Sequence, residues 1–129
     1  MDTGDGRKIK ILIVDDEPIN LDYLDIKLTS LGFMTEKAPD GEEALKKIEH
    51  FFPDLILLDN VMPKMTGFEF TKIIKAKPMY QNIPIIMLSA LDKDEDKKRG
   101  LELGITKYIT KPILFPQLIK QIHSVLGEI

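Results

Sequence analysis

Polar side chains that could carry out chemistry stand directly after apolar runs at four places in this chain. Asp15 and Asp16 follow "ILIV", Asp59 follows "LILL", Ser89 follows "IIML", and Lys111 follows "YIT". A single Asp in such a place means little, because Asp often opens a turn or caps a helix. Four apolar runs that all end in a reactive polar group are a less common coincidence, and they indicate one site built from the ends of several strands.

Three carboxylates brought together call for a cation. The chain has no Cys, and neither of its two His residues stands at these run ends. A hard, oxygen-binding ion is therefore expected, and Mg²⁺ fits best, with Mn²⁺ as a substitute. A hydroxyl and an ammonium group at the same rim complete the equipment for phosphoryl transfer, in which a carboxylate can be the nucleophile.

The elements that must position these groups alternate along the chain. Short apolar runs predict strands at Ile9–Val14, Phe33–Lys37, Leu55–Leu58, Ile85–Leu88 and Ile105–Ile109. The first, third and fourth contain continuously apolar stretches, which are typical of strands covered on both faces. The second and fifth are more mixed, which favours the edges of a sheet.

Helix signals fill the gaps between the predicted strands. Pro18 can occupy a first helical turn, and Gly32 follows a leucine-rich face as a stop. Three pairs resemble capping boxes: Asp40 with Glu43, Thr66 with Glu69, and Asp92 with Glu95.

Alternation of strand and helix predicts an α/β fold with a parallel sheet between two helical layers. The best order is 2-1-3-4-5, a three-layer doubly wound (βα)5 arrangement of the flavodoxin-like type. Ligands of such sheets bind beyond the carboxyl ends of the strands, near the chain reversal between strands one and three. Asp15, Asp16 and Asp59 follow those two strands.

Composition narrows the function classes. The 129 residues suit one domain, and 18 basic against 21 acidic residues give a net charge of -3, which does not indicate a nucleic-acid binder. No apolar leader or membrane-length run is present, so we expect a cytoplasmic protein without membrane contact. Residues 1–8 are expected to form a flexible polar tail, and residues 9–129 the domain.

Four motifs arrive in order at the expected strand ends: "VDDEP", "LILLDNVMPKMTGFE", "IIMLSA" and "YITKP". As a set they resemble the receiver domain of two-component response regulators, of the chemotaxis-receiver type. The resemblance covers about residues 9–127, nearly the whole chain.

The resemblance implies a phosphoprotein that carries a 4-aspartylphosphate. Asp59 would be the phosphoacceptor and would take the phosphoryl group from a kinase phosphohistidine. Asp16 and Asp59 would bind Mg²⁺ through their side chains, and the Val61 carbonyl would be a backbone ligand. Asp15 would act through a metal-bound water.

The same resemblance implies the residues that bind the phosphoryl group. Lys111 would pair with the phosphoacceptor and later with a phosphoryl oxygen. Ser89 would hydrogen-bond another phosphoryl oxygen, with the Ala90 amide beside it. The Lys111–Pro112 peptide is expected to be cis, which an X–Pro bond tolerates.

The resemblance also implies a switch. Ser89 would move toward the phosphoryl group, Tyr108 would rotate inward behind it, and the face made by helix four, strand five and helix five would change. Two simpler interpretations stay open: Tyr108 can be a core residue of an edge strand, and the polar helix-four segment around Gly100 can be a merely solvated helix. Val61 and Leu91 flank the phosphoryl position, and their apolar side chains suggest slow self-dephosphorylation.

Implied partners are a sensor histidine kinase or a phosphotransfer protein in a phosphorelay, and a downstream effector or a fused output domain. A homodimer that forms on phosphorylation is also compatible. The chain would be no enzyme beyond catalysing its own phosphorylation and dephosphorylation.

Three alternatives differ in class. A haloacid-dehalogenase-type phosphatase also uses a nucleophilic Asp, but its second carboxylate would stand at Val61. A flavodoxin-like FMN binder needs a phosphate-binding loop where this chain has "DDEPIN", which would repel phosphate. A receiver that serves only as a phosphorylation-independent interaction module is disfavoured by the presence of all the expected site residues.

Overall fold

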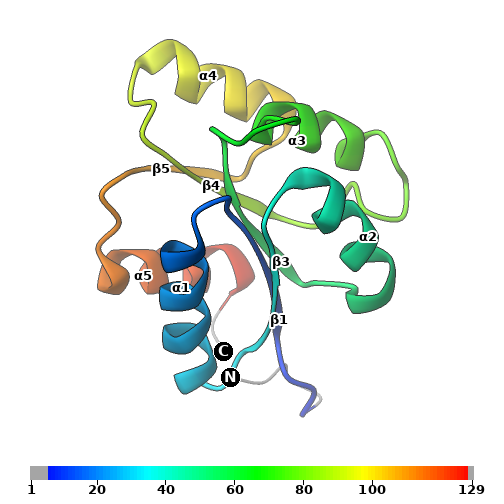
Figure 1. Cartoon of the computed structure of the whole chain (residues 1–129), viewed down its shortest axis with the longest axis vertical. Coiled ribbons are helices and arrows are strands. Elements are labelled where there is room, and N and C mark those ends of the chain that lie inside the picture. Colours follow the sequence, from blue (N-terminus) through cyan, green and yellow to red (C-terminus); the bar gives the residue numbers. More distant parts are fainter. Residues whose placement is uncertain (1–5, 128–129) are drawn as a thin grey trace.

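A computed structural model describes residues 6–127, in which five strands alternate with five helices (Figure 1). Arg7 forms an ion pair with Asp54 at 3.0 Å. Residues 1–5 of the expected tail lie outside the described residues, so the division into a tail and a domain stays a prediction. The elements are β1 (Lys10–Val14), α1 (Pro18–Ser30), β2 (Met34–Ala38), α2 (Gly41–Phe51), β3 (Leu55–Asp59), α3 (Gly67–Lys75), β4 (Ile85–Ser89), α4 (Asp94–Leu103), β5 (Lys107–Thr110) and α5 (Phe115–Leu126).

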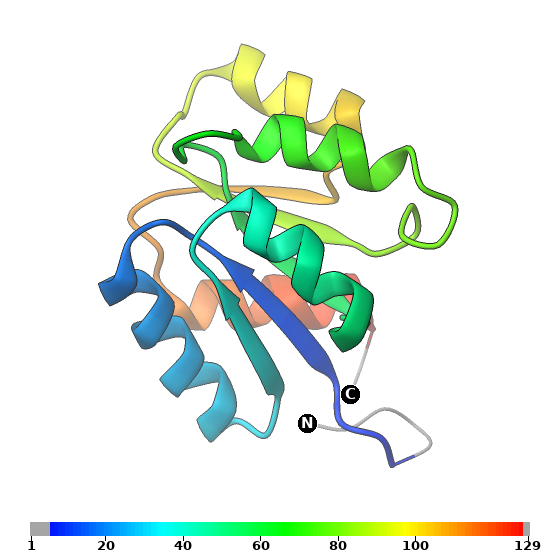
Figure 2. The same ribbon diagram turned by 45° about the vertical axis from the view of Figure 1, so that its right-hand side comes forward.

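The five strands form one parallel sheet in the order β2-β1-β3-β4-β5, as the sequence predicted. Figure 2 shows β1 and β2 running side by side, with α1 on the left of them and α2 on the right. The order in which strands are added to the sheet reverses at β1, because β2 lies on one side of β1 and β3 pairs with its other side. The ends of β1 and β3 are therefore brought together at one rim.

Helices cover both faces of the sheet. Alternate strand residues pack against α1 and α5 on one face and against α2 and α3 on the other, because successive side chains of a strand point in opposite directions. All five residues of β3 and all five of β4 are buried. Apart from Asp59 and Ser89 at their ends, both strands are apolar, and their burial contributes to the hydrophobic stabilisation of the fold.

The helix ends agree with the sequence in part. Thr66 and Glu69 form a complete capping box at α3, and Asp40 accepts a hydrogen bond from the Glu43 amide at α2. The predicted box at Asp92 and Glu95 is wrong. Helix α4 begins one residue later than that box requires, so its N-cap is Lys93, which makes no side-chain capping bond.

The fifth strand begins two residues later than predicted. Ile105 is buried, but its amide donates to the carbonyl of Gly100 at 3.0 Å and so closes the end of α4. Its apolar side chain covers the helix end, a common accompaniment of such caps. Helix α4 itself buries only Gly100 within the described part of the chain.

Strand β2 is an edge strand whose outer side is occupied by charged groups. The Lys37 ammonium pairs with Asp22 at 3.0 Å and with Asp25 at 3.6 Å, both on α1. The Lys47 ammonium donates to the carbonyl of Lys37, and Thr35 donates to Asp25. Charged side chains at an edge strand discourage pairing with another strand.

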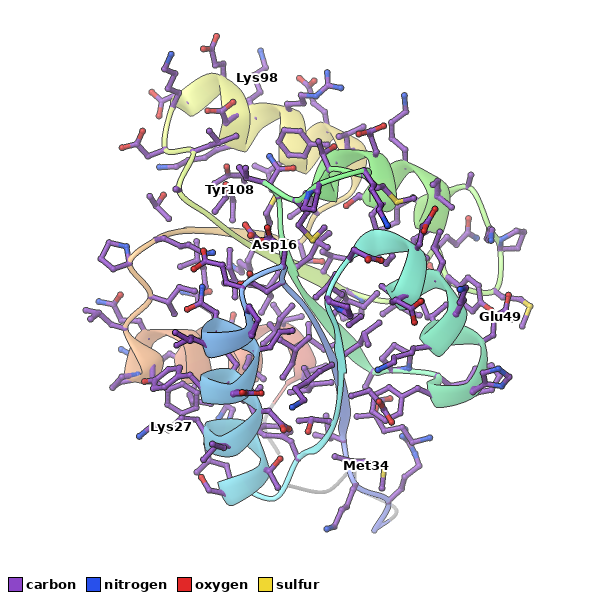
Figure 3. All side chains as sticks on the ribbon, in the orientation of Figure 1. Asp16, Lys27, Met34, Glu49, Lys98 and Tyr108 are labelled. Atoms are coloured by element: carbon purple, nitrogen blue, oxygen red, sulfur yellow. The ribbon has the colours of Figure 1, made fainter. Side chains whose placement is uncertain are left out.

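In Figure 3 Asp16 is labelled near the centre of the view, beyond one end of β1, and Met34 is labelled at the opposite end of the strands. No helix in residues 6–127 is long and apolar enough to cross a membrane.

Replacement of Phe70 by Ala should lower the free energy of unfolding by about 3–5 kcal/mol, because Phe70 is fully buried and a cavity would remain. Urea unfolding followed by circular dichroism measures the change. Phe52→Ala is the matched control, since Phe52 is 54% exposed, and it should cost less than about 1 kcal/mol. Equal losses in the two variants would contradict this account of the core.

Candidate functional site

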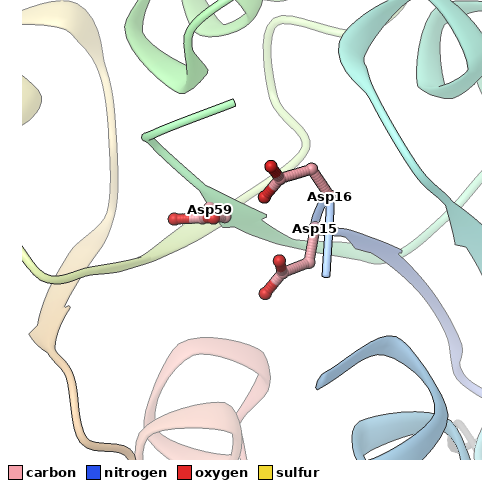
Figure 4. A group of neighbouring side chains, drawn as sticks. All are labelled: Asp15, Asp16 and Asp59. Carbon is pink, nitrogen blue, oxygen red and sulfur yellow. The ribbon is translucent and has the colours of Figure 1, made fainter. Parts of the chain in front are cut away.

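Three carboxylates meet at the rim above β1 and β3. One oxygen from each of Asp15, Asp16 and Asp59 lies within 4.8 Å of the others. Asp15 and Asp59 are buried, with 3% and 5% of their surfaces exposed, and Asp16 is exposed. Figure 4 shows Asp15 and Asp16 leaving the end of β1 and turning their carboxylates toward the space beside Asp59. The sheet order forces this meeting, because β1 and β3 are neighbours.

Lys111 is the cation that faces this cluster. Its ammonium lies 3.5 Å from an oxygen of Asp15 and 3.6 Å from an oxygen of Asp59. The side chain is mostly buried, so its charge is less screened than a surface charge would be. One ammonium opposite three carboxylates leaves an excess of negative charge in the site.

Burial raises the pKa of Asp59 to about 6, from 3.8 for an ordinary Asp. The nearby Lys111 ammonium opposes that shift, and the negative charge of Asp15 adds to it. The carboxylate is therefore destabilised in its ionised form, and a cation that enters the site would relieve the destabilisation.

The turn between β1 and α1 holds Asp15 in place. Its two oxygens accept a hydrogen bond from the Glu17 amide at 3.0 Å and a long one from the Asn20 amide group at 3.5 Å. Asn20 was not predicted from the sequence as a site residue. The only available signal was its position in the first turn of a helix that follows two acids, which is too common to be informative.

The backbone after Asp59 is fixed by Asn60 and Gly67. The Asn60 side-chain oxygen accepts from the Phe68 amide at 3.0 Å, and the Asn60 carbonyl accepts from the Gly67 amide at 2.9 Å. A Cβ on Gly67 would lie 2.6 Å from the Asp59 carbonyl oxygen. Gly67 thus permits the close approach of α3 that holds the end of β3, and Asn60 is a second residue that sequence reasoning missed.

A chain of hydrogen bonds runs from the site to β5 through the backbone amide and carbonyl of one residue, Leu91. The Leu91 amide donates to the Ser89 hydroxyl at 3.1 Å, and the Tyr108 hydroxyl donates to the Leu91 carbonyl at 2.7 Å. Ser89 is fully buried at the end of β4. Burial raises the pKa of the Tyr108 phenol, so it remains a hydrogen-bond donor at neutral pH.

Five of the predicted site residues line a cavity of about 320 Å³, and Asp15, Ser89 and Tyr108 do not. Its lining contains Asp16, Asp59, Val61, Ala90 and Lys111, together with Glu17. Val61 is 57% exposed, and its amide donates a weak hydrogen bond to Asp59 at 3.4 Å. Asp15 is in the cluster but does not line this cavity.

Two other predicted features are the Tyr108 side chain, on β5, and the Lys111–Pro112 peptide bond, directly after β5. The Tyr108 hydroxyl is connected to Ser89 through the backbone of Leu91. The Lys111–Pro112 peptide bond is cis.

Oxygen donors of this kind fit a hard divalent cation. Two buried carboxylates and one exposed carboxylate supply the ligand type that Mg²⁺ prefers, and solvent reaches the site through the exposed side. Burial first, and the charge of Asp15 to a lesser degree, raise the pKa of Asp59, so a cation bound here would favour its ionised form.

Comparison with known proteins gives a consistent picture. A family model described as the response regulator receiver domain matches residues 11–123. Over 120 residues the chain is 38% identical to the phosphate regulon transcriptional regulatory protein PhoB of Klebsiella pneumoniae, and the match covers 93% of this chain and 52% of PhoB. The chain therefore spans about half the length of that relative.

Two solved structures are similar throughout. The chemotaxis protein CheY4 of Vibrio cholerae has a TM-score of 0.88 at 36% identity, with 92% of this chain and 99% of that one covered. A chain of the CheX-CheY-BeF3-Mg²⁺ complex of Borrelia burgdorferi has a TM-score of 0.90 at 33% identity, with 98% of this chain and 96% of that one covered.

Without divalent metal, Asp59→Asn should raise the free energy of unfolding by up to about 3 kcal/mol above pH 7. The native pKa of Asp59, about 6, lies above its ordinary value of 3.8. As the pH falls through this window, the folded protein takes up a proton that the unfolded chain does not yet bind. The unaltered protein therefore gains stability on acidification, and the advantage of the variant shrinks toward pH 4.

Urea unfolding in EDTA at several pH values measures this difference. Glu42→Gln, which removes an exposed acid from α2, is the control and should show no such pH-dependent gain. An Asp59→Asn gain of equal size at pH 5 and pH 8 would contradict the assignment of the raised pKa.

Proposed function

Because the chain belongs to the response regulator receiver domains of two-component systems, we propose that Asp59 is its phosphoacceptor. A phosphoryl group would come from the phosphohistidine of a sensor histidine kinase or of a phosphotransfer protein. The single observation that carries the proposal is the position of the Asp59 carboxylate, buried and flanked by two other acids and by Lys111.

Mg²⁺ would be held by the side chains of Asp16 and Asp59 and by the Val61 carbonyl, with Asp15 acting through a bound water. Mn²⁺ could replace it, since both ions favour oxygen ligands. When bound, the ion would neutralise the excess negative charge and attract the oxygens of the transferred group.

In the transfer step, a carboxylate oxygen of Asp59 attacks the phosphorus atom. The phosphorus–nitrogen bond of the phosphohistidine breaks, and its electron pair stays on the imidazole nitrogen. Lys111 lies 3.6 Å from Asp59 and would pair with a phosphoryl oxygen after transfer. The Ser89 hydroxyl and the Ala90 amide would bind the other oxygens, which spreads the new charge over fixed donors.

Phosphorylation would act on the output face through the hydrogen-bonded chain at Leu91. If the Ser89 side chain rotates to bring its hydroxyl to a phosphoryl oxygen, the oxygen that accepts from the Leu91 amide moves with it. Tyr108 is bonded to the same residue's carbonyl and would adjust its ring with it. The face made by α4, β5 and α5 would then present a different surface, as a shift between two existing states.

The partners follow from the same proposal. A kinase or phosphotransfer protein would load Asp59, and a downstream effector or a fused output domain would read the α4-β5-α5 face. PhoB is named as a transcriptional regulator, and the chain covers only 52% of it, so a fused output domain is one form the effector could take. We propose a cytoplasmic protein that contacts neither membrane nor nucleic acid directly, with a homodimer after phosphorylation as a further state.

A receiver is a regulatory domain, and the family match does not favour a haloacid-dehalogenase-type phosphatase or a phosphorylation-independent module. We propose that the only reactions it catalyses are its own phosphorylation and dephosphorylation.

Incubation with Mg²⁺ and acetyl phosphate should add one phosphoryl group, detected as a mass increase of the intact protein. Asp59→Asn should abolish the adduct, because Asp59 alone among the three carboxylates both lines the cavity and pairs with Lys111. Chelation of the metal should also abolish it.

Asp54→Asn is the matched control, since Asp54 lies at the far end of β3 and pairs with Arg7. It should leave the adduct unchanged. Folded protein that gains no phosphoryl group from a competent donor would contradict the proposal, and continued turnover of phosphate esters would favour the phosphatase.

Replacement of Val61 by Asn should shorten the lifetime of the phosphorylated form, on the order of tenfold, because a polar side chain could hold the attacking water. Val61 lines the cavity, and Leu91, which follows the lining residue Ala90, is 38% exposed. Neither apolar side chain can hydrogen-bond an attacking water. The loss of the phosphoryl adduct with time measures the rate. Leu101→Asn is the control, because Leu101 is equally exposed at 57% but lies on α4. An unchanged lifetime in Val61→Asn would count against this explanation.

A further inference from the structure

The two edges of the sheet differ in how they meet solvent. At β2 the outer edge is covered by the ion pairs of Lys37 and by the ammonium of Lys47. At β5 only one side is paired, with β4, and its outer side is not paired with any described strand. An uncovered edge presents a row of backbone groups that another strand can bind.

The hydrogen-bond pattern identifies which groups of β5 face outward. Ser89 is the register partner of Thr110, but its carbonyl accepts from the Lys111 amide at 2.8 Å. In a parallel pair of strands, a residue forms its backbone hydrogen bonds with the residues before and after its register partner. The N–H and C=O of the register partner then point away from that strand. The backbone groups of Thr110, and by alternation those of Tyr108, therefore point away from β4.

A groove of about 440 Å³ lies along this uncovered edge. It is lined by Tyr108, Ile109 and Thr110 of β5 and by Gln117, Lys120 and Gln121 of α5. Gln117 and Gln121 are one helical turn apart, so their amide groups lie on the same side of α5. The groove thus combines outward-facing backbone groups with side chains that both donate and accept hydrogen bonds.

The charged side chains at the groove are all positive. Lys120 is exposed in its wall, and Lys107 lies on the same face of β5 as Ile109. Neither lysine forms an ion pair within the described part of the chain, and no carboxylate lines the groove. Charge complementarity therefore favours an acidic occupant.

We propose that the β5–α5 groove binds an extended acidic segment of a partner protein, which adds as a strand to the outer edge of β5. The inference rests on the proposed function, because it names the partner of the α4-β5-α5 face. A second copy of this chain is a poorer occupant, since a twofold pairing of two β5 edges would bring both sets of lysines together.

The test uses a short peptide that alternates Glu and Val, acetylated and amidated at its ends, added to the whole chain. Amide hydrogen exchange followed by NMR should slow at Tyr108 and Thr110, and should change little at Ile109, whose amide already faces β4. If the peptide docked as a helix instead, hydrogen exchange would not slow at alternate residues of β5. No slowing at Tyr108 and Thr110 under saturating peptide overturns the proposal.

Charge variants make the test specific. Lys120→Glu should weaken peptide binding by about fivefold or more, and Lys120→Arg should restore most of it. Lys46→Glu, an equally simple reversal on α2 where the side chain is 74% exposed, should have little effect. Equal weakening by Lys46→Glu, or amide protection that grows with protein concentration in the absence of peptide, overturns the proposal.

The acetyl phosphate experiment on the same preparation separates the two claims. If the peptide binds but Asp59 gains no phosphoryl group, the proposed function is overturned and the proposal for the groove stands. If Asp59 gains a phosphoryl group but the peptide does not bind, only the proposal for the groove is overturned.

Discussion

Mutual repulsion among three carboxylates at the end of a buried sheet is the constraint on which this protein depends. Apolar burial along β1 and β3 holds Asp15, Asp16 and Asp59 together against that repulsion. Lys111 balances only part of the charge, and the pKa of Asp59 rises as a result of burial. The hydrophobic core therefore holds the carboxylates in an arrangement in which they repel one another. Binding of the proposed metal ion would reduce this repulsion.

Much of this arrangement is readable from the sequence, because apolar runs and their polar ends are strong local signals. The strand order followed from which runs were continuously apolar, and it brought Asp15 and Asp59 to one rim. Features set by hydrogen bonds between distant residues were not readable. Ile105 resembles a strand residue until its amide is seen to close α4. Asn60 carries no sequence signal beyond an Asn that follows an Asp, although its side chain fixes the loop after β3.

Helix α4 illustrates how a missing side chain can matter as much as a present one. A Cβ on Gly100 would lie 3.3 Å from the Tyr108 ring and from the Ile105 side chain, which is tight for both. The helix can therefore approach β5 closely although it buries almost nothing else. Its few apolar anchors are consistent with the expected rearrangement of this helix, and its position beside Tyr108 connects it to the proposed output face.

The backbone of Leu91 links Ser89 to Tyr108, and this affects how such proteins can be studied and how they can change. Its amide bonds to Ser89, and its carbonyl accepts from Tyr108. Both bonds use the main chain, so almost any side chain at position 91 would preserve the connection. Alanine scanning would report this position as unimportant, and evolution would be free to vary it for other purposes, such as tuning the lifetime of a phosphorylated state. A signal route made of backbone is thus hidden from side-chain mutagenesis, and only proline, which lacks the amide hydrogen, would expose it.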